Sequence, residues 1–249
     1  MALNPSVNPL GRRFTELEQI GSTNDLARER IETGSALHGE VFFAWHQTAG
    51  RGQLGKPWMS SPKQNLAMTL VLENKQLPDP IPFHLSACCA TACQAVLTEI
   101  TRGDLQIKWP NDLYWKSRKL GGLLIETQPS WSILGIGINV NQTQFDPSLP
   151  NPVSIRQITG QERSPRDLAK DIVDALNAQI TRWHQQGFSA LLNQYRSTLF
   201  GKDQLFAVRE KGIEKHVRII EVDESGGLIL EENGQKRTVV SGLEWIIKN

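Results

Sequence analysis

Residues 50–58 read Gly-Arg-Gly-Gln-Leu-Gly-Lys-Pro-Trp, and a strand-like segment, Leu-Ala-Met-Thr-Leu-Val-Leu, follows at residues 66–72. The glycines and Lys56 match two nucleotide-binding patterns, G-x-G-x-x-G and G-x-x-x-x-G-K. Both patterns require a helix directly afterwards, and the second also requires Ser or Thr where this chain has Pro57. The chain therefore has neither standard nucleotide-binding fold. Taken alone, the loop is explained equally well as an anion-binding segment or as an ordinary surface turn.

The composition limits the class of protein without naming its function. The chain has 249 residues and a formal net charge of +1, so it has no general attraction to nucleic acid or acidic membranes. No apolar run reaches the length of a membrane span, and the first nine residues lack the features of a signal peptide. Cys88, Cys89 and Cys93 lie close together, which predicts buried thiols in a reducing cytoplasm rather than disulfides or a metal site.

The apolar periodicity predicts a mixed α and β catalytic domain over residues 1–200. A capping box formed by Ser22 and Asp25 predicts one helix start, with Leu26 and Ile31 on its inner side, and Ser164-Pro165 predicts another. Strands are expected at 40–47, 65–73, 105–109, 120–126 and 131–140, and helices at 83–100, 164–187 and 188–199.

The pattern changes at Gly201, where short alternating strands begin. Val217, Ile219 and Val222 are expected to face a core, although Ile220 breaks the alternation. Hairpin turns are predicted at 225–227 and 233–234. We therefore predict a second domain, a small β-barrel over residues 201–249, which packs on the first because it is too short to be stable alone.

Three further clusters contain residues that are suited to catalysis or ligand binding. Residues 108–112, Lys-Trp-Pro-Asn-Asp, place polar side chains where Pro110 stops a strand, and ordinary turn chemistry explains the last two. Turn chemistry does not explain Lys108, which needs a carboxylate, a phosphate or solvent at its tip. Residues 118–122 and 135–141 place glycines inside strands, which marks either close approach of a ligand or a bulge.

Together these motifs closely resemble those of the biotin protein ligases. The matching stretches are Ser22-Thr-Asn24, Gln47-Thr-Ala-Gly-Arg-Gly52 with Trp58, Lys108-Trp-Pro-Asn-Asp112, Lys119-Leu-Gly-Gly-Leu-Leu-Ile-Glu126 and Gly135-Ile-Gly-Ile-Asn139. They occur in the family's order and span nearly the whole chain. The resemblance implies the biotin-ligase fold, a mixed β-sheet flanked by helices and followed by an SH3-like barrel. About twenty residues precede the first motif, so we expect the short, monofunctional type without a DNA-binding domain.

The resemblance implies a reaction in which biotin and ATP form biotinyl-5′-AMP, and a lysine of a carrier protein then takes the biotinyl group. It assigns catalysis to Arg51, Lys108, Asp112 and Lys119, with Asp112 as a base or a ligand of Mg²⁺. The biotin contacts implied are Ser22, Thr23, Asn24, Gln47, Gly50, Arg51, Gly52, Gln53, Lys119, Gly121, Gly122 and Leu123. The ATP contacts implied are Arg51, Trp58, Lys108, Asn111 and Asn139.

More detailed roles follow from the same resemblance. Ser22, Thr23 and Gln47 are expected to bind the ureido head of biotin, and Leu123 is expected to form an apolar wall beside Gly121 and Gly122. Trp58 and Asn139 are expected to meet the adenine, and Asn111 the ribose or a phosphate. The glycine-rich loop is expected to close over the ligands. The family often carries basic residues where this chain has Gln53 and Leu54, so fewer charges are available here to retain the adenylate.

The expected partner is the biotin carboxyl carrier protein of acetyl-CoA carboxylase, with no role for nucleic acid or membranes. A cytoplasmic monomer or homodimer fits the sequence equally well. Two alternatives stay open: a lipoate–protein ligase with the same adenylate logic, and a non-catalytic module that binds biotin or a nucleotide. Lys108 and Lys119 argue against the second alternative, because binding alone would not need so much positive charge.

Overall fold

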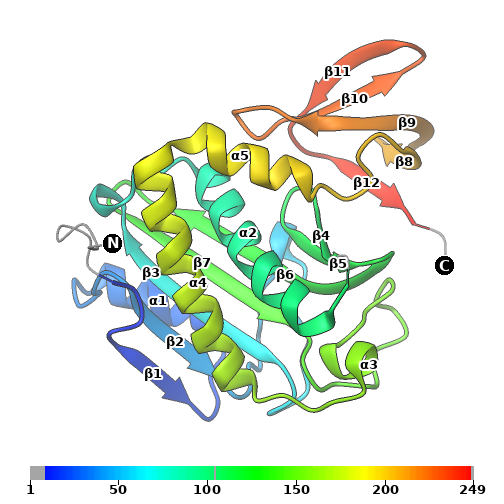
Figure 1. The fold of residues 1–249 in the computed structure, drawn as a ribbon. Helices are drawn as coiled ribbons and strands as arrows, with labels where there is room; N and C mark the ends of the chain where they lie inside the picture. Colours follow the sequence, from blue (N-terminus) through cyan, green and yellow to red (C-terminus); the bar gives the residue numbers. More distant parts are fainter. Residues whose placement is uncertain (1–8, 104, 248–249) are drawn as a thin grey trace.

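The computed structural model describes residues 9–103 and 105–247, and its centre is a seven-stranded sheet (Figure 1). The strand order is β1-β2-β3-β7-β6-β5-β4; β1 and β2 are parallel, and the other pairs are antiparallel. The predicted mixed sheet is therefore confirmed. The strand bounds are β1 Phe14–Leu17, β2 Glu40–Ala44, β3 Leu66–Glu73, β4 Leu105–Lys108, β5 Asp112–Trp115, β6 Arg118–Thr127 and β7 Trp131–Ile138. The signal-peptide prediction for residues 1–9 falls almost wholly outside the described residues.

Helices cover the two faces of this sheet unequally. The helices α2 (Pro82–Thr101) and α4 (Pro165–Gln186) pack on one face, α5 (Phe188–Ser197) lies against α2, and together they bury the main apolar core. Helix α1 (Thr23–Glu32) packs on the other face over β2, β3 and β7. Only a small apolar cluster lies beneath it, built from Ala27, Phe42, Val71 and Ile133 with Leu26 and Ile31 at its edge. Beyond this cluster, the α1 face includes the buried Thr69 and the glycine backbone of β7.

The predicted helix starts have different outcomes. The Ser164 side chain accepts a hydrogen bond from the backbone nitrogen of Asp167, as its cap role requires. Ser22 also stands at a cap position, but its side chain makes no capping hydrogen bond. The capping box predicted for Ser22 and Asp25 is wrong, because the Asp25 carboxylate pairs with Arg28 and Arg51 instead of turning back to the helix.

Several short elements were not predicted, and three strands end early: β2, β4 at Lys108 instead of residue 109, and β7 at Ile138 instead of residue 140. Strands β1 and β5 have four residues each, too few to establish an alternating pattern. Helix α3 (Ile155–Thr159) has five residues and begins with a capping box between Ser154 and Gln157, between the strand predicted at 131–140 and the helix predicted at 164–187. Strand β2 ends at Ala44 rather than at residue 47.

The C-terminal residues form a second, five-stranded antiparallel sheet of order β11-β10-β9-β8-β12, consistent with the predicted SH3-like unit. Its strands are β8 Leu205–Glu210, β9 Ile213–Val222, β10 Leu228–Glu232, β11 Gln235–Val239 and β12 Leu243–Ile246. Val217, Ile219 and Val222 are buried as predicted. The alternation breaks at Ile220 because the β9–β10 register shifts there, so that Ile219 and Glu221 face consecutive residues of β10. Residues 248–249 of the predicted barrel lie outside the described residues.

The turn between β9 and β10 joins the second sheet to the first. The Trp109 indole nitrogen donates to the Gly226 carbonyl at 2.9 Å, and Arg196 Nε donates to the Val222 carbonyl at 2.7 Å. A Cβ on Gly226 would lie 2.4 Å from the Phe83 ring, so this turn fits closely against the start of α2. The division into domains at residues 200 and 201 stays a prediction.

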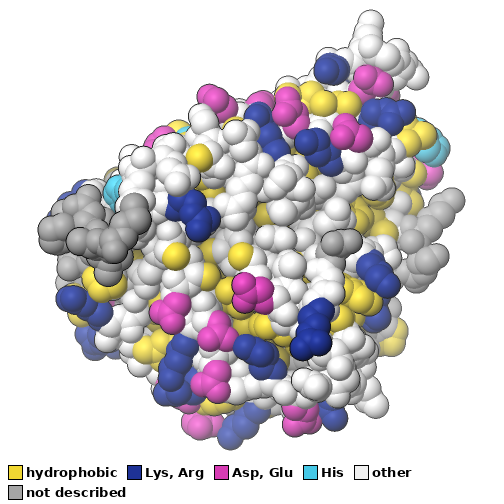
Figure 2. All heavy atoms as spheres, viewed as in Figure 1, with side chains coloured by type: hydrophobic (Ala, Val, Ile, Leu, Met, Phe, Trp, Pro, Cys, Tyr) yellow, Lys and Arg dark blue, Asp and Glu magenta, His cyan; other side chains and the backbone are white. Residues whose placement is uncertain are grey.

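Other composition-based predictions can be compared with the fold. Cys88, Cys89 and Cys93 are buried and free, and burial raises the pKa of the Cys88 and Cys89 thiols. None of the described helices is long and apolar enough to cross a bilayer. The surface seen in Figure 2, which α2, α4 and α5 cover, carries acidic and basic side chains side by side. This face therefore has no large field of one sign.

Candidate functional site

The α1 face of the sheet has a floor of glycine backbone. Gly122 of β6 pairs with Gly137 of β7, and Leu124 pairs with Gly135. A Cβ on Gly135 would lie 2.4 Å from Asn24 Oδ1, and a Cβ on Gly137 would lie 2.5 Å from the Trp58 ring. The β7 glycines predicted to mark a ligand site thus bring that strand into direct contact with the start of α1 and with the glycine-rich loop.

A chain of hydrogen bonds lines one part of this floor. Gln47 Oε1 accepts from the Thr23 backbone nitrogen at 2.7 Å and from the Thr23 hydroxyl at 3.0 Å. The Thr69 hydroxyl lies 2.7 Å from the Thr23 hydroxyl and 2.6 Å from Asn24 Oδ1. Because Gln47 Oε1 is occupied, the amide nitrogen is the Gln47 group available to a ligand as a donor. Ser22, which makes no cap bond, lies buried beside this chain.

Two arginines and two carboxylates continue the chain toward the solvent. Asn24 Nδ2 donates to Glu126 Oε2 at 2.9 Å. Arg51 spans Asp25 Oδ1 at 2.5 Å and Glu126 Oε1 at 2.8 Å, and Arg28 contacts the same two oxygens at 3.0 and 2.5 Å. The hydrogen bond to Asp25, together with the Glu126 charge, raises the pKa of Arg51. Arg51 is thus tied to both α1 and β6.

A separate cluster of charges lies beside Gly122. Lys119 Nζ is 2.6 Å from Asp112 Oδ1, and Lys108 Nζ is 3.8 Å from Asp112 Oδ2. The Lys108 side chain is only 13% exposed, and burial lowers its pKa against the opposing influence of Asp112. Its ammonium also lies 5.2 Å from the Tyr114 ring centre and 5.3 Å from that of Trp245, which belongs to β12. Lys108 has therefore found a carboxylate and two aromatic rings, as its place in a strand requires.

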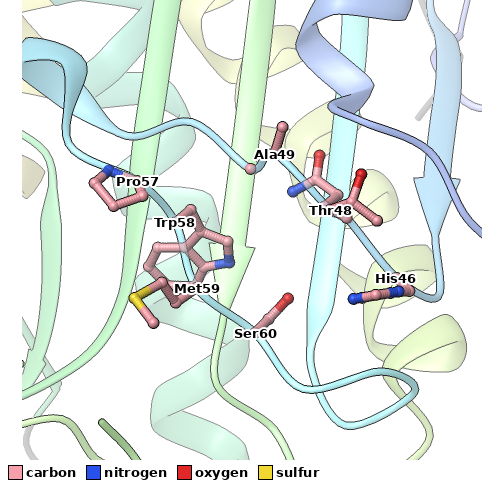
Figure 3. A pocket seen from close by; sticks show the side chains of 9 residues that line it. His46, Thr48, Ala49, Pro57, Trp58, Met59 and Ser60 are labelled. Carbon is pink, nitrogen blue, oxygen red and sulfur yellow. The ribbon is translucent and has the colours of Figure 1, made fainter. Parts of the chain in front are cut away.

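A cavity of about 450 Å³ opens between the two limbs of the glycine-rich loop (Figure 3). In this view Pro57, Trp58 and Met59 line one side, and His46, Thr48 and Ala49 line the other. The Trp58 ring packs on Gly137, and its indole nitrogen is buried without a hydrogen-bond partner among the described residues. This donor can serve a ligand that enters the cavity. The full lining is His46, Gln47, Thr48, Ala49, Gly50, Pro57, Trp58, Met59 and Ser60.

The structure does not bring all four predicted catalytic residues together. Lys108, Asp112 and Lys119 form one cluster, whereas the Arg51 guanidinium lies at Glu126. Glu126 is four residues along β6 from Gly122, which contacts the lysine cluster, so about 13 Å of strand separates the two places. The glycine-rich loop contains three more predicted contacts, Gly50, Gly52 and Gln53. A short 3₁₀ turn within it begins at Gln53 and ends at Gly55.

Two of the predicted biotin contacts point to the opposite face of the sheet. Leu123 belongs to the main core, and a Cβ on Gly121 would meet the Gly137 carbonyl and the Ile138 side chain. The expectation that Leu123 forms the apolar wall is wrong, because its side chain points away from the site. Leu124, whose partner in the register is Gly135, lies on the site face.

Two predicted ATP contacts use their amides within the protein. Asn111 is buried; its side-chain nitrogen donates to the Leu123 carbonyl, and its own carbonyl accepts from the Leu123 nitrogen. Asn111 therefore joins β6 to the turn before β5, and its predicted contact with the ribose or a phosphate stays a prediction. Asn139 donates to the Val153 carbonyl at 3.1 Å and to that of Lys119 at 3.4 Å, which leaves its side-chain oxygen for an adenine.

The sequence reasoning missed several members of the site. Glu126 ends one of the quoted motifs and Asp25 directly follows another, but the sequence predicts only a capping role for Asp25 and no role for Glu126. Thr69 lies in an apolar strand, and its pairing with Gly135 across β3 and β7 places it beneath Asn24. A polar residue in an otherwise apolar strand is a usable signal, because buried hydroxyl groups need partners.

Comparisons with known proteins identify the family of this chain. The model of the biotin/lipoate A/B protein ligase family matches residues 16–142. A biotin–[acetyl-CoA-carboxylase] ligase of Mycobacterium tuberculosis is 27% identical over 235 residues, which cover 93% of this chain and 88% of that protein.

Two solved structures share the fold. The biotin protein ligase of Aquifex aeolicus, solved in complex with biotin and ATP, has a TM-score of 0.81 and 22% identity, covering 95% of this chain and all of that one. The Leishmania major biotin protein ligase in complex with biotinyl-5-AMP has a TM-score of 0.64 and 25% identity, covering 92% and 99% of the two chains. The chain therefore belongs to the biotin/lipoate A/B protein ligase family.

Proposed function

We propose that this protein is an ATP-dependent biotin ligase that activates biotin as biotinyl-5′-AMP and transfers it to a lysine of a biotin carboxyl carrier protein. The family membership and the relatives described above support this function. The observation that carries it is the order of groups on the α1 face. Hydrogen-bonding side chains at Thr23 and Gln47, a bare glycine floor, and the ammonium group of Lys119 follow one another.

This order matches the chemistry of biotin. The ureido head needs donors and acceptors, which Ser22, Thr23 and Gln47 offer. The apolar rings need a flat surface, which the β6 and β7 backbone offers beside Leu124. The carboxylate tail needs a cation, which Lys119 offers next to Gly122. The Trp58 ring, which packs on Gly137, is proposed to contact the adenine of the nucleotide.

In the first step, a biotin carboxylate oxygen attacks the α-phosphorus of ATP, a carbonyl–phosphate anhydride forms, and pyrophosphate leaves. Two anions meet in this step, so the rate depends on fixed positive charge at their junction. Lys108 and Lys119, within 3.8 Å and 2.6 Å of the same carboxylate, are the described cations that lie together beside the glycine floor. We assign them to this junction.

In the second step, the carrier lysine attacks the acyl carbon, an amide forms, and AMP leaves. The attacking amine must be neutral, and an unperturbed lysine has a pKa of about 10.4, so a proton acceptor is required. Asp112 is the carboxylate at this end of the floor. It has two roles in this proposal: it holds Lys119 in place, and it receives the proton when the amine enters.

The residues do not form a metal site that the protein itself would fill. The two Asp112 oxygens already contact ammonium groups, and the described residues contain no group of three His, Cys, Asp or Glu that could hold a metal. No step is therefore assigned to a protein-bound ion. Mg²⁺ belongs to the proposal only as a companion of the ATP phosphates, where it keeps most of its water.

The remaining parts of the proposal concern partners. The carrier protein is proposed to be that of acetyl-CoA carboxylase, because the relative from Mycobacterium tuberculosis is named for that substrate. No part is assigned to nucleic acid or membranes, the location is proposed to be the cytoplasm, and a monomer or homodimer stays a prediction.

Intact-mass measurement of a purified carrier domain tests the function directly. After incubation with this protein, biotin, ATP and Mg²⁺, the carrier is expected to gain the mass of a single biotinyl group, and no gain is expected without ATP. A competent carrier that gains no mass with biotin but gains a lipoyl group with lipoate would replace the proposal with lipoate ligation. No gain with either acid would leave a binding module.

Replacing Asp112 by asparagine separates its two roles. The amide keeps the shape but cannot take a proton, so transfer from preformed biotinyl-adenylate is expected to slow by about 10²-fold or more. Single-turnover transfer measured with added adenylate reports this step alone. If Asp112→Asn slows adenylate formation while transfer keeps its normal rate, the assignment as base is wrong.

A further inference from the structure

We propose that Asp25 and Glu126 are positioning residues that hold the glycine-rich loop in place through the Arg51 guanidinium. In this role Arg51 anchors the loop through ion pairs, and Lys108 and Lys119 bind the anionic groups of the ligands. The inference rests on the proposed function, because it assigns the loop the task of retaining the adenylate, but the contacts that carry it are independent of any substrate.

The contacts of the loop make Arg51 its main attachment. The backbone hydrogen bonds of residues 52–56 stay within the loop, where the nitrogen of Gly52 donates to the Lys56 carbonyl and that of Lys56 to the Gln53 carbonyl. Leu54, at the tip, is 90% exposed. Among the described contacts of residues 51–56, the ion pairs of Arg51 with Asp25 and Glu126 connect the loop to α1 and β6.

The geometry is that of a two-point attachment. The two terminal nitrogens of Arg51 each contact a different carboxylate, at 2.5 and 2.8 Å, so the planar guanidinium bridges a helix and a strand. Arg28 contacts the same two carboxylates, and Asn24 donates to the second oxygen of Glu126. Glu126 is thus fixed by three donors, and its own position is set by residues that also line the ligand floor.

The charge balance argues against a second role for Arg51 as an anion-binding group. Two guanidinium groups and two carboxylates meet here, so the cluster carries no net charge. A ligand anion at Arg51 would meet a guanidinium whose charge two carboxylates already balance. The lysine cluster, by contrast, has two ammonium groups for the single carboxylate of Asp112 and keeps a net positive charge.

The test uses the variants Glu126→Gln and Asp25→Asn, with Glu244→Gln as the matched control. Glu244 also pairs with an arginine, Arg209 at 3.2 Å, but on the C-terminal sheet. Thermolysin cleaves before exposed leucines, so cleavage at Leu54 without biotin or ATP reports opening of the loop. We expect cleavage to be about tenfold faster in both variants and unchanged in the control. The melting temperature of the protein is expected to stay the same in all three.

A second measurement ties the loop to its task. The rate at which bound biotinyl-adenylate escapes is expected to rise in the same variants and to stay unchanged in Glu244→Gln. Arg51→Lys, which keeps the charge but loses the fork, is expected to behave like Glu126→Gln. Unchanged cleavage at Leu54 would overturn the proposal. Tighter biotin binding in Glu126→Gln would also overturn it, because the carboxylates would then be competitors for Arg51.

The two proposals fail separately. If wild-type protein forms no biotinyl-adenylate but the variants still open the loop, the proposed function is wrong and the attachment stands. If adenylate forms and is transferred but cleavage is the same in every variant, the ligase function stands and the attachment is wrong.

Discussion

Replacing Lys119 by alanine is expected to lower biotinyl transfer to the carrier by two to three orders of magnitude. Removal of a single preorganised group that stabilises developing charge typically costs about 10²–10³ in rate. Lys119 is such a group, because Asp112 holds its ammonium at 2.6 Å beside the glycine floor. The variant also leaves Asp112, whose side chain is 17% exposed, with the more distant Lys108 as its only described ion-pair partner.

Single-turnover assays of both steps, with the melting temperature of each variant, check this prediction. Lys170→Ala is the matched control, because this exposed lysine lies on α4, on the opposite face of the sheet. Lys119→Arg should recover part of the loss if charge is what matters. A Lys119→Ala variant that keeps its melting temperature and transfers biotin within threefold of the wild-type rate would remove Lys119 from the chemistry.

Replacing Gly137 by alanine is expected to weaken ATP binding by roughly tenfold to a hundredfold. The new Cβ would lie 2.5 Å from Trp58 Cε2 and 2.7 Å from Cζ2, closer than carbon atoms approach. Overpacking of this kind costs about 1–3 kcal/mol. The indole must therefore leave its place on β7, and the cavity lined by the loop loses one of its walls.

Calorimetric titration with ATP or a non-hydrolysable analogue measures the effect. Gly21→Ala is the control, because a Cβ there meets no atom within 4 Å. Unchanged ATP affinity in Gly137→Ala would show that the position of the Trp58 ring does not determine nucleotide binding. A drop in stability of the whole protein, detected by urea unfolding, would assign the change to the fold instead of the site.

Strong local patterns in the sequence predicted most of the fold. The apolar repeat from Leu168 to Trp183 spans more than four turns and has a complete start signal at Ser164, so α4 was predicted with nearly correct bounds. Strand β5, with four residues, and α3, with five, are too short for a repeat to appear. Their places are set by tertiary pairing, which a single sequence does not display.

The site was predicted in its composition but not fully in its geometry. Lys108 could be identified because a charge within an apolar strand requires a partner. The sequence could not predict which of Leu123 and Leu124 points toward the site, because apolar residues occupy both faces of β6 and the strand shows no alternating pattern. A register shift beside Leu113, which leaves Leu120 outside the pairing of β5 with β6, adds a further change of face. The pairing of Arg51 with Glu126 joins residues 75 positions apart, beyond the reach of any local pattern.

The contact between Lys108 and Trp245 affects chimeric proteins in which the C-terminal segment is exchanged between related ligases. One of the rings around a proposed catalytic lysine comes from β12, close to the end of the described chain. A hybrid protein that joined residues 1–200 to the C-terminal segment of another ligase would supply a foreign side chain at this point. Such hybrids should keep activity only when the donor segment brings an aromatic residue to the place of Trp245, even if the junction and both halves fold normally.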